Sequence, residues 1–458
     1  MKVLFIVKSF IIEPLGIMYL SAAAKAAGHK TDLVRISNNL EKKLDEFDPD
    51  IVAYSLMTGD QDLYLDLNQS LKRTHQFLSV FGGPHPTFFP EIIKEDGVDI
   101  ICRGEGEQAF VELLNKLEKA EDITQISNFL IKRDGRINQN GVRPFADLDS
   151  LPFPDRELVN QFPEIRNGPI KHFIASRGCP FNCSYCFNEK YSQLYLNKGK
   201  RVRFRNVGSL VDEIEDVVNS SLTKFVYFQD DTFTLNKKWL KDFTKEYAER
   251  VKLPFHCHVR PNTVDEEIVN QLKQAGCYSV HIAAETANDR LRNDILNRRM
   301  TREQIIKATI LLREHGIRLM LQNIIGLPTG CLEDDLATLE MNIEAKPDYA
   351  WVSIFQPYPG TKLGEFCRQQ EYYMGDFSDL SSNFFDSSNL NFPVRYKNQL
   401  SHLQKLFAIF VEYPDLHRLG LSQVMIDIPN TEETRERYQT AYKQFRKKGD
   451  KRLYGFDL

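Results

Sequence analysis

The sequence predicts an α/β protein with three parts: an N-terminal doubly wound sheet, a partial (β/α)6 barrel and a small, mostly helical C-terminal region. Short apolar strands alternate with amphipathic helices in two separate blocks, a pattern typical of parallel sheets. A stretch rich in Gly, Pro, Asn and Asp lies between the blocks. We therefore expect a first domain over 1–133, a linker over 134–168, a barrel over 169–390 and a helical region over 391–458.

In the first block, apolar strands are expected at 3–7, 31–36, 50–56 and 77–83, and a helix from Gly16 that ends at Gly28. Residues 101–119 predict a strand, a glycine-containing turn and a last helix. A doubly wound sheet binds its ligands at the carboxyl ends of its strands. The loops there are Lys8–Leu15, Ser55–Gln61, Gly82–Thr87 and Arg103–Glu107.

In the second block, six strands are expected, which is a partial rather than a complete eightfold barrel. They are 172–176, 224–229, 255–260, 279–285, 319–326 and 349–356. Amphipathic helices at 208–221, 263–276 and 301–316 fall between them. Beyond residue 391 the alternation stops, and 398–413 and 431–448 predict helices. The aromatic-rich segment 371–386 could cover a site, but we favour a loop that packs its aromatic rings inward.

The composition is that of an ordinary globular protein, with 42% hydrophobic and 27% charged residues over 458 positions. A net charge of −4 argues against nucleic acid as a partner, and no apolar run is long enough to span a bilayer. The opening MKVLFIVKSF predicts a buried strand rather than a signal peptide. We therefore expect a cytoplasmic protein with reduced thiols.

Three of the eight cysteines, Cys179, Cys183 and Cys186, lie within the stretch SRGCPFNCSYCFNEKY, directly after an expected strand. The other five are scattered singly, and we expect them to be small buried hydrophobes. These are Cys102, Cys257, Cys277, Cys331 and Cys367.

Three kinds of site compete for the clustered cysteines. A structural zinc site needs a fourth ligand, which His172 or the His256–His258 pair could supply. A redox dithiol would use Cys183 and Cys186 and leave Cys179 without a role. An iron–sulfur cluster held by only three thiolates would keep one iron open, and an open coordination site is where a metal does chemistry.

The stretch CPFNCSYCF resembles the CxxxCxxC signature of radical S-adenosylmethionine (SAM) enzymes, including the aromatic Tyr185 before the third cysteine. The resemblance implies that Cys179, Cys183 and Cys186 hold a [4Fe-4S] cluster whose open iron chelates SAM. Electron transfer would then cleave SAM to a 5′-deoxyadenosyl radical, with an external low-potential electron donor as a partner.

Further segments match the family's SAM contacts at their positions in the barrel. Gln229, Asp230 and Asp231 lie where the family contacts the SAM amino group, although aspartate and threonine there could also cap the next helix. Arg260, a further candidate SAM contact, is expected at a strand end where it can pair with a carboxylate, and Glu285 is expected near the ribose, with a structural ion pair left open for both. Ile325, in NIIGLPTG, is expected beside adenine.

The pieces EPLGIMYLSAAAKAAGH, GGPHPT and RGEGE resemble the cobalamin-binding Rossmann-like domain of cobalamin-dependent radical SAM enzymes. Glycine pairs at strand ends let the backbone approach a large flat ligand. The aspartate-x-histidine-x-x-glycine motif of many cobalamin proteins is missing, so the lower face of cobalt, near Ser55–Gln61, is left unassigned. The alternative is a domain that binds a nucleotide or nothing. The cobalamin contacts that the resemblance implies are Pro14, Leu15, Gly16, Ser55, Thr58, Gly82, Gly83, His85, Thr87, Glu105, Gly106 and Glu107.

Together the two resemblances imply a cobalamin-dependent radical SAM enzyme. The leading hypothesis is a methyltransferase that moves a methyl group from methylcobalamin to an unactivated carbon (or phosphorus) of a small-molecule or natural-product substrate. One alternative is oxidative cyclisation or rearrangement without methyl transfer. A lower-ranked alternative is a non-catalytic iron–sulfur protein for electron transfer or sensing. A methylthiotransferase is set aside because the first domain holds only Cys102, and the pattern identifies no catalytic residue.

Overall fold

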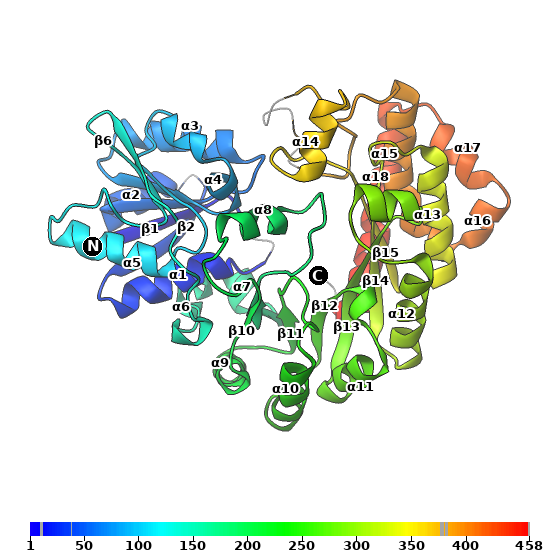
Figure 1. The fold of residues 1–458 in the computed structure, drawn as a ribbon, viewed down its shortest axis with the longest axis horizontal. Coiled ribbons are helices and arrows are strands. Elements are labelled where there is room, and N and C mark those ends of the chain that lie inside the picture. Colours follow the sequence, from blue (N-terminus) through cyan, green and yellow to red (C-terminus); the bar gives the residue numbers. More distant parts are fainter. Residues whose placement is uncertain (10–11, 38, 376–379, 381–382, 457–458) are drawn as a thin grey trace. The chain divides into compact units, whose positions relative to one another are not determined.

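The computed structural model describes residues 1–9, 12–37, 39–375, 380 and 383–456 (Figure 1). The chain forms two compact units. The first comprises Met1–His172, Lys190–Ser209 and Asn219–Thr223, and the second comprises Phe173–Glu189, Leu210–Val218 and Lys224–Leu458.

The first unit is built on a seven-stranded sheet with the order β2-β1-β3-β4-β5-β6-β7. The first five strands are parallel, and β6 and β7 are antiparallel additions at one edge. The strands are β1 (Lys2–Val7), β2 (Lys30–Arg35), β3 (Ile51–Ser55), β4 (Leu78–Gly82), β5 (Ile100–Cys102), β6 (Phe129–Arg133) and β7 (Arg136–Gln139). The order 2-1-3-4-5 places a topological switch point between β1 and β3, where a doubly wound sheet binds its ligand.

Helices cover both faces of this sheet, which confirms the doubly wound prediction. Alternate β1 residues Leu4 and Ile6 pack with Leu44 and Leu71 of the helices on one face. Phe5, of opposite parity, lies 6.1 Å from the Phe110 ring on the other face. The helices are α1 (Leu15–Ala26), α2 (Leu40–Phe47), α3 (Gln61–Lys72), α4 (Pro84–Phe88), η1 (Pro90–Lys94) and α5 (Glu107–Glu118).

The interval predicted as a linker contains structure that the sequence interpretation did not foresee. Residues 136–139 form β7, which pairs with β6 as a hairpin. Asp134 and Gly135 make the turn with φ of 50° and 71°. Asp-Gly is a strong two-residue hairpin signal, because both central residues need positive φ. The rest of the interval holds η2 (Leu148–Ser150), α6 (Arg156–Asn160) and α7 (Pro163–Arg166).

The loop after β1 is anchored by Glu13, which is 4% exposed. The His172 N–H donates to its carboxylate at 2.6 Å, and Arg156 Nη1 lies 3.0 Å from its other oxygen. Burial opposes ionisation, but the His172 hydrogen bonds and the Arg156 charge together lower the pKa of Glu13 to about 2. The carboxylate therefore stabilises the fold only while it is ionised.

Acid is expected to weaken this anchor. The folded pKa of about 2 lies below the ordinary 4.5, so the stabilisation is complete above pH 4.5 and is lost as pH falls toward 2. It amounts to about 3 kcal/mol in all. Urea unfolding at pH 6 and pH 3.5 checks this. The difference in free energy of unfolding between wild type and Glu13→Gln should be about 1 kcal/mol smaller at pH 3.5 than at pH 6. An unchanged difference contradicts the assignment.

The second unit is built on a six-stranded sheet with the order β15-β14-β13-β12-β11-β8, parallel from β11 to β15. This matches the predicted partial barrel. The strands are β8 (Ile170–Phe173), β11 (Phe225–Phe228), β12 (Phe255–Val259), β13 (Cys277–Glu285), β14 (Arg318–Ile325) and β15 (Tyr349–Ile354). Two further short strands are β9 (Ser176–Arg177), in the second unit, and β10 (Arg203–Phe204), in the first.

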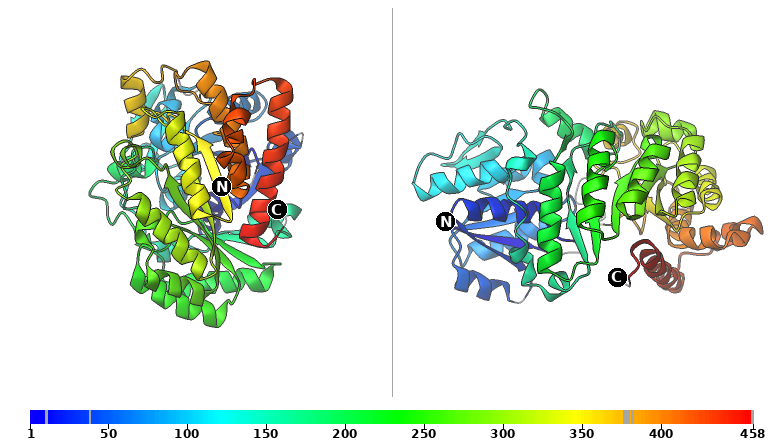
Figure 2. Two further views of the ribbon diagram at one scale, coloured as in Figure 1. Left: turned by 90° about the vertical axis from the view of Figure 1, so that its right-hand side faces the viewer. Right: turned by 90° about the horizontal axis from the view of Figure 1, so that it is seen from below.

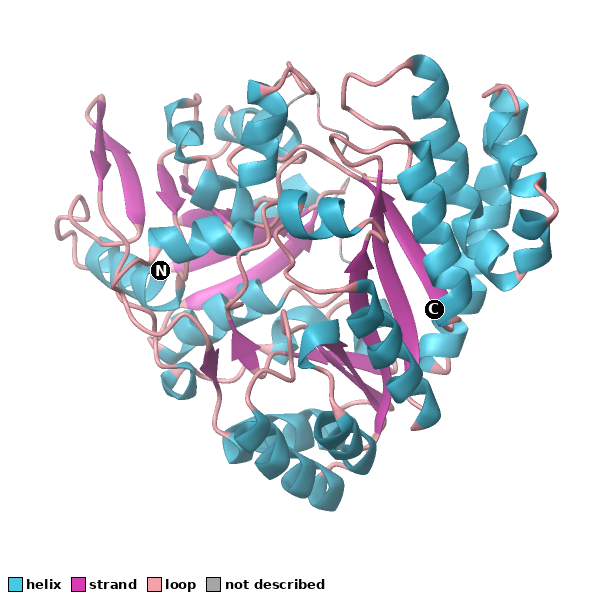
Figure 3. Ribbon diagram, turned by 45° about the vertical axis from the view of Figure 1, so that its right-hand side comes forward, coloured by secondary structure: helices cyan, strands magenta, loops and turns pink. Residues whose placement is uncertain are grey.

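Helices cover the outer side of the second sheet and complete the β/α alternation (Figure 3). Their apolar faces form one core with the strands, and Leu272, Leu312 and Leu339 are fully buried. These helices are α9 (Val207–Ser220), α10 (Lys237–Arg250), α11 (Glu266–Ala275), α12 (Arg302–Glu314) and α13 (Leu332–Ala345). The short turns η3 (Pro261–Thr263) and η4 (Leu291–Ile295) and the helix α14 (Lys362–Gln369) follow strand ends.

The C-terminal region is helical as predicted, and it packs against the second sheet. Leu403 and Phe407 join a core with Val352 of β15. The long helices α15 and α18 run side by side (Figure 2). Gly449 of α18 meets the Tyr349 ring so closely that a Cβ would overlap it. The elements are α15 (Val394–Glu412), α16 (Pro414–Arg418), α17 (Leu421–Asp427) and α18 (Glu432–Tyr454).

The aromatic-rich segment 371–386 is predicted to be a loop that packs its rings inward. In the aromatic-rich segment 371–386, Tyr373 is 4% exposed and the Phe384 and Phe385 rings lie 5.9 Å from Trp351. Its described aromatics therefore pack inward, while 376–379, 381 and 382 lie outside the described residues. Within the ranges given above, no helix is long and apolar enough to cross a membrane.

Candidate active site

The three clustered cysteines lie on the loop that follows β9 and leads into α8 (Phe187–Leu194). Cys183 is buried, and Cys179 and Cys186 are half-buried. Hydrogen-bond donors point at these sulfurs: the Asn188 N–H donates to Cys186 Sγ at 3.5 Å, and Arg260 Nη1 donates to Cys183 Sγ at 3.4 Å. The loop therefore presents three thiols together with groups that stabilise negative charge on sulfur.

Burial raises the pKa of Cys179, and it raises the pKa of Cys186 to about 12. These two are protonated at neutral pH unless a cation displaces the proton. An all-sulfur donor set of this kind suits zinc or an iron–sulfur cluster. Three thiols with hydrogen-bond donors to sulfur fit a [4Fe-4S] cluster that has one iron without a protein ligand.

Arg260, predicted to pair with a carboxylate, reaches the cysteine loop from the end of β12. It is 6% exposed, and its guanidinium lies 3.9 Å from the Phe181 ring centre. Besides Cys183, it donates to Asn262 and to the Arg298 carbonyl. The side chain is fixed against the cysteine loop before any ligand binds.

Glu285, the predicted ribose contact, forms a buried network with Tyr185 and Arg298. The Tyr185 hydroxyl donates to Glu285 Oε1 at 2.7 Å. Arg298 Nη1 donates to both, at 2.8 Å and 3.0 Å. Glu285 also has a φ of 69°, a strained conformation for a residue with a Cβ. The structural ion pair that the sequence analysis left open for Glu285 is therefore present. It connects Tyr185, the aromatic residue before the third cysteine, to Glu285 at the end of β13.

Arg298 was missed by sequence reasoning. It is 4% exposed and lies after the short η4 turn, between Asn297 and Arg299, which have φ of 52° and 53°. No period marks it in the sequence. The only signal is the arginine pair in LNRRM, which reads as ordinary surface charge.

The three candidates after β11 are not equivalent. The two carboxylate oxygens of Asp230 accept from the Ala175 N–H at 3.0 Å and from the Ser176 hydroxyl. Burial raises the pKa of Asp230 to about 6. Asp231 accepts from Asn188 Nδ2 at 3.1 Å, and the Gln229 N–H donates to the Phe173 carbonyl. Asp230 thus holds the strand before the cysteine loop, while Asp231 and half-buried Gln229 lie nearer the surface.

The sequence also allowed an aspartate or threonine of this segment to cap the next helix. That prediction was wrong, because a different residue is the cap. Asn236 caps α10, and its side chain accepts from the Trp239 N–H at 3.1 Å. An asparagine one position before the first helical turn outcompetes the earlier aspartates because it sits where the free N–H groups point.

Ile325 lies fully buried at the end of β14. The next residue, Gly326, has a φ of 68°, and its N–H donates to Asp335 Oδ1 at 3.0 Å. Burial raises the pKa of Asp335 to about 7. The turn after β14 is therefore fixed by a buried carboxyl group on α13.

In the first unit, the loops after β3 and β4 are locked together. Gly83 has a φ of 94°, and a Cβ there would lie 2.9 Å from the Leu56 N and O atoms. The His85 N–H donates to the Leu56 carbonyl, and His85 Nδ1 lies 3.2 Å from Thr58 Oγ1. Burial lowers the pKa of His85 to about 4, so its ring is neutral. This is a backbone cradle at the carboxyl edge of the sheet.

The loop after β5 is held by residues that come much later in the chain. Arg203 forms an ion pair with Glu105, and the Glu105 N–H donates to the Tyr195 hydroxyl at 2.8 Å. Gly104 lies against the same hydroxyl with a φ of 75° and has no room for a Cβ. Residues 190–209 therefore group with the first unit, which differs from the predicted boundaries.

The remaining predicted cobalamin contacts lie at the same edge of the sheet, where helices α1 and α5 begin. Pro14 and Gly106 are the residues that precede the two helices. Thr87 donates to the Gly83 carbonyl within the loop after β4. Leu15 and Glu107 are buried, Gly16 and Ser55 are exposed, and Gly82 is half-buried.

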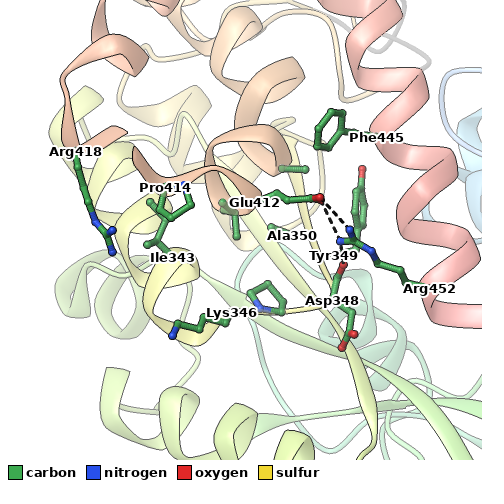
Figure 4. Close-up of a pocket in the computed structure, with 13 residues that line it drawn as sticks. Ile343, Lys346, Asp348, Tyr349, Ala350, Glu412, Pro414, Arg418, Phe445 and Arg452 are labelled. Atoms are coloured by element: carbon green, nitrogen blue, oxygen red, sulfur yellow. Dashed lines mark hydrogen bonds and ion pairs between the residues drawn. The ribbon is translucent and has the colours of Figure 1, made fainter. Parts of the chain in front are cut away.

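A cavity of about 290 Å³ opens elsewhere in the second unit (Figure 4). Lys346, Tyr349 and Arg418 are among its lining residues. Glu412 and Arg452, which pair at 2.9 Å, also line it. The cavity lies at the amino end of β15, whereas the site residues above lie at the carboxyl ends of the strands, so we do not place the site there.

Comparison with protein families gives two matches. Residues 173–341 match the radical SAM superfamily and residues 1–114 match the B12 binding domain. An uncharacterized methyltransferase of Pyrococcus horikoshii is 31% identical over 366 residues, which is 77% of this chain and 78% of that protein. The anaerobic magnesium-protoporphyrin IX monomethyl ester cyclase of Cereibacter sphaeroides is 30% identical over 428 residues, which is 87% of this chain and 66% of the cyclase.

Two solved structures share the fold. The cobalamin-dependent SAM radical enzyme OxsB with aqua-cobalamin bound has a TM-score of 0.72 at 17% identity, covering 98% of this chain and 72% of OxsB. The radical SAM methyltransferase TsrM of Kitasatospora setae, with cobalamin and a [4Fe-4S] cluster bound, has a TM-score of 0.66 at 18% identity, covering 81% of this chain and 75% of TsrM.

Proposed function

Because this chain belongs to the cobalamin-dependent radical SAM enzymes, we propose that it is a methyltransferase acting on an unactivated carbon (or phosphorus) of a small molecule. Its cofactors are a [4Fe-4S] cluster, SAM and cobalamin. When bound, the cluster supplies the electron that cleaves SAM to a radical, and cobalamin supplies the methyl group. The observation that carries the proposal is the loop of three thiols at the strand ends, with Arg260 donating to one of its sulfurs.

In the proposed site, Cys179, Cys183 and Cys186 would hold the cluster. Arg260 and the Asn188 N–H would offset the negative charge on the cluster sulfurs. This assignment gives Arg260 a different role from the carboxylate contact expected from sequence, since its Nη1 is directed at Cys183.

Tyr185, Glu285 and Arg298 would position SAM beside the cluster. Glu285 keeps acceptor capacity for ribose hydroxyls, because a carboxylate has about four lone-pair sites and Tyr185 and Arg298 both donate to its Oε1. Asp231 and Gln229 are the better candidates for the SAM amino group, since the oxygens of Asp230 are committed to the chain. Buried Ile325 would support the adenine pocket from behind.

The backbone cradle of Leu56, Gly83 and His85 would seat cobalamin in the first unit. The twelve residues expected from sequence to contact it are all at the carboxyl edge of the sheet or at the helix starts that follow. His85 and Thr58 are the polar groups of the cradle, and a neutral His85 ring suits either a hydrogen bond or a ligand role.

Replacing Gly83 by alanine is expected to reduce cobalamin retention, because the new Cβ would push against the Leu56 backbone and displace the loop after β3. Gly135→Ala is the matched control. It has a similarly positive φ of 71° but nothing within 4 Å, so it adds only the backbone strain of about 1–2 kcal/mol. Cobalt per protein after desalting is the measurement. Equal retention in both variants contradicts the role given to Gly83.

A second candidate function is oxidative cyclisation without methyl transfer, which the 30% identity to the cyclase of Cereibacter sphaeroides favours. Reconstituted enzyme incubated anaerobically with a reductant and methyl-labelled SAM separates the two. A methyltransferase places the label in the corrinoid fraction and, with substrate present, in the product. Formation of 5′-deoxyadenosine without labelled corrinoid or product would replace the first proposal by the second.

The partners follow from this chemistry. We propose a low-potential electron donor from outside the chain, a small-molecule or natural-product substrate, and a cytoplasmic location where thiols stay reduced. The net charge of −4 gives no support to nucleic acid as a partner.

A further inference from the structure

Three histidines gather on one face of the second sheet, away from the cysteine loop. His256 and His258 are alternate residues of β12 and so point to the same side. In the register of β12 and β13, His258 lies opposite His281, and His256 lies opposite Ser279. One nitrogen of each ring can be chosen so that all three lie within 4.8 Å of one another.

Hydroxyl groups surround the three rings. Ser279 Oγ lies 2.8 Å from His256 Nδ1, and the Tyr227 hydroxyl lies 3.1 Å from His258 Nε2 and 3.4 Å from His281 Nδ1. Tyr454 of α18 lies 3.1 Å from His281 Nε2. Hydrogen bonds of this kind orient imidazole rings and select which nitrogen is available to a metal.

The three rings are largely enclosed. His256 is fully buried and His281 is 9% exposed, while His258 is half-buried and leaves an approach to the three histidines.

We propose that His256, His258 and His281 bind one zinc ion, with the Tyr227 oxygen beside them as the fourth ligand. Imidazole nitrogen is a preferred zinc ligand, and three histidines with an oxygen make a four-coordinate set. Nitrogens bound to one tetrahedral zinc are about 3.3 Å apart, given a Zn–N distance of about 2.0–2.1 Å. The present separations of up to 4.8 Å therefore have to shorten by up to about 1.5 Å when zinc binds.

This site is separate from the proposed cluster site, although one strand serves both. Arg260, which follows the end of β12 two residues beyond His258, turns to the cysteine loop and donates to Cys183. The histidines instead contact side chains of β11, β13 and α18. Zinc in the histidine site therefore needs no thiolate.

The test uses the full chain with Cys179, Cys183 and Cys186 all replaced by serine, so that the clustered thiols cannot bind zinc. After treatment with a chelator, the protein is titrated with Zn²⁺ by calorimetry and with Co²⁺ by visible absorption. We expect one equivalent of each, with the intense absorption of four-coordinate Co²⁺. Neither SAM nor cobalamin is added, so failure of the proposed methyltransferase activity leaves this experiment unaffected.

Variants then assign the site. His258→Gln and His281→Gln should lose zinc affinity by at least about 100-fold, and Ser279→Ala by about 10- to 100-fold. His75→Gln, a histidine on the first unit that pairs with Asp45, is the matched control and should change nothing. If the protein with serine at the three cysteine positions gives no four-coordinate Co²⁺ spectrum, the proposal is overturned, whatever the histidine variants show. Unchanged zinc affinity in well-folded His258→Gln would overturn it as well.

Discussion

Replacing Cys183 by alanine is expected to abolish reductive cleavage of SAM. Cys183 is the buried member of the three thiols and accepts a hydrogen bond from Arg260, so alanine removes a ligand and takes one of the three acceptors of the guanidinium away. A four-iron cluster with two thiolate ligands is not held. Iron and sulfide per protein after anaerobic reconstitution, and 5′-deoxyadenosine formed with a chemical reductant, should both fall to the level of a protein-free control.

Cys331→Ala is the matched control for this experiment. Cys331 is exposed and precedes α13, where its thiol and backbone contact Asp334. Its loss should cost at most about 1 kcal/mol of stability, as for other helix caps, and leave the iron content unchanged. Full iron content together with SAM cleavage in Cys183→Ala would refute the cluster assignment.

Replacing Arg298 by methionine is expected to destabilise the protein by about 3–5 kcal/mol and to weaken SAM binding. Arg298 is buried and makes an ion pair with Glu285 at 3.0 Å, while its guanidinium also holds Tyr185. Removing one partner of a buried pair leaves the other charge uncompensated. Anaerobic guanidinium unfolding of the cofactor-free protein measures the stability change, and it separates that change from any effect on catalysis.

A double variant makes this test sharper. Arg298→Met with Glu285→Gln removes both charges, so it should recover part of the stability lost in Arg298→Met, a coupling that a double-mutant cycle measures. Arg302→Met is the surface control. Its partner Glu344 is half exposed, so its loss should cost under about 1 kcal/mol. A double variant as unstable as the sum of the two single changes would show that Arg298 and Glu285 are not coupled.

The parts of the site that could be predicted are those carried by local sequence. Cys179, Cys183 and Cys186 all lie on one short loop. Their proximity therefore does not depend on how the strands pair. Arg260 and Glu285 could be placed at strand ends because strands have a visible period of two. Arg298 could not, because its burial depends on two neighbours with positive φ that no local pattern announces.

The pairing across strands was beyond sequence reasoning for a different reason. The alternation of His256 and His258 was visible, but their meeting with His281 depends on the register between β12 and β13, which shifts at His256. A shift of one residue would turn the histidines to the opposite face. The β6–β7 hairpin, by contrast, was within reach, because Asp134 and Gly135 form a recognised turn signal that the polar composition of the segment obscured.

The late return of residues 190–209 to the first unit has a practical consequence for anyone who wishes to dissect this enzyme. A fragment ending at residue 172 would keep the whole seven-stranded sheet, yet it would lack Tyr195 and Arg203. Glu105 would lose its ion-pair partner Arg203, and Gly104 would lose its contact with the Tyr195 ring. The loop after β5 would therefore lack the contacts that hold it. Corrinoid affinity measured on that fragment would understate the intact protein. Adding a peptide spanning 190–209 in trans should restore part of it, which makes the two pieces a natural complementation pair.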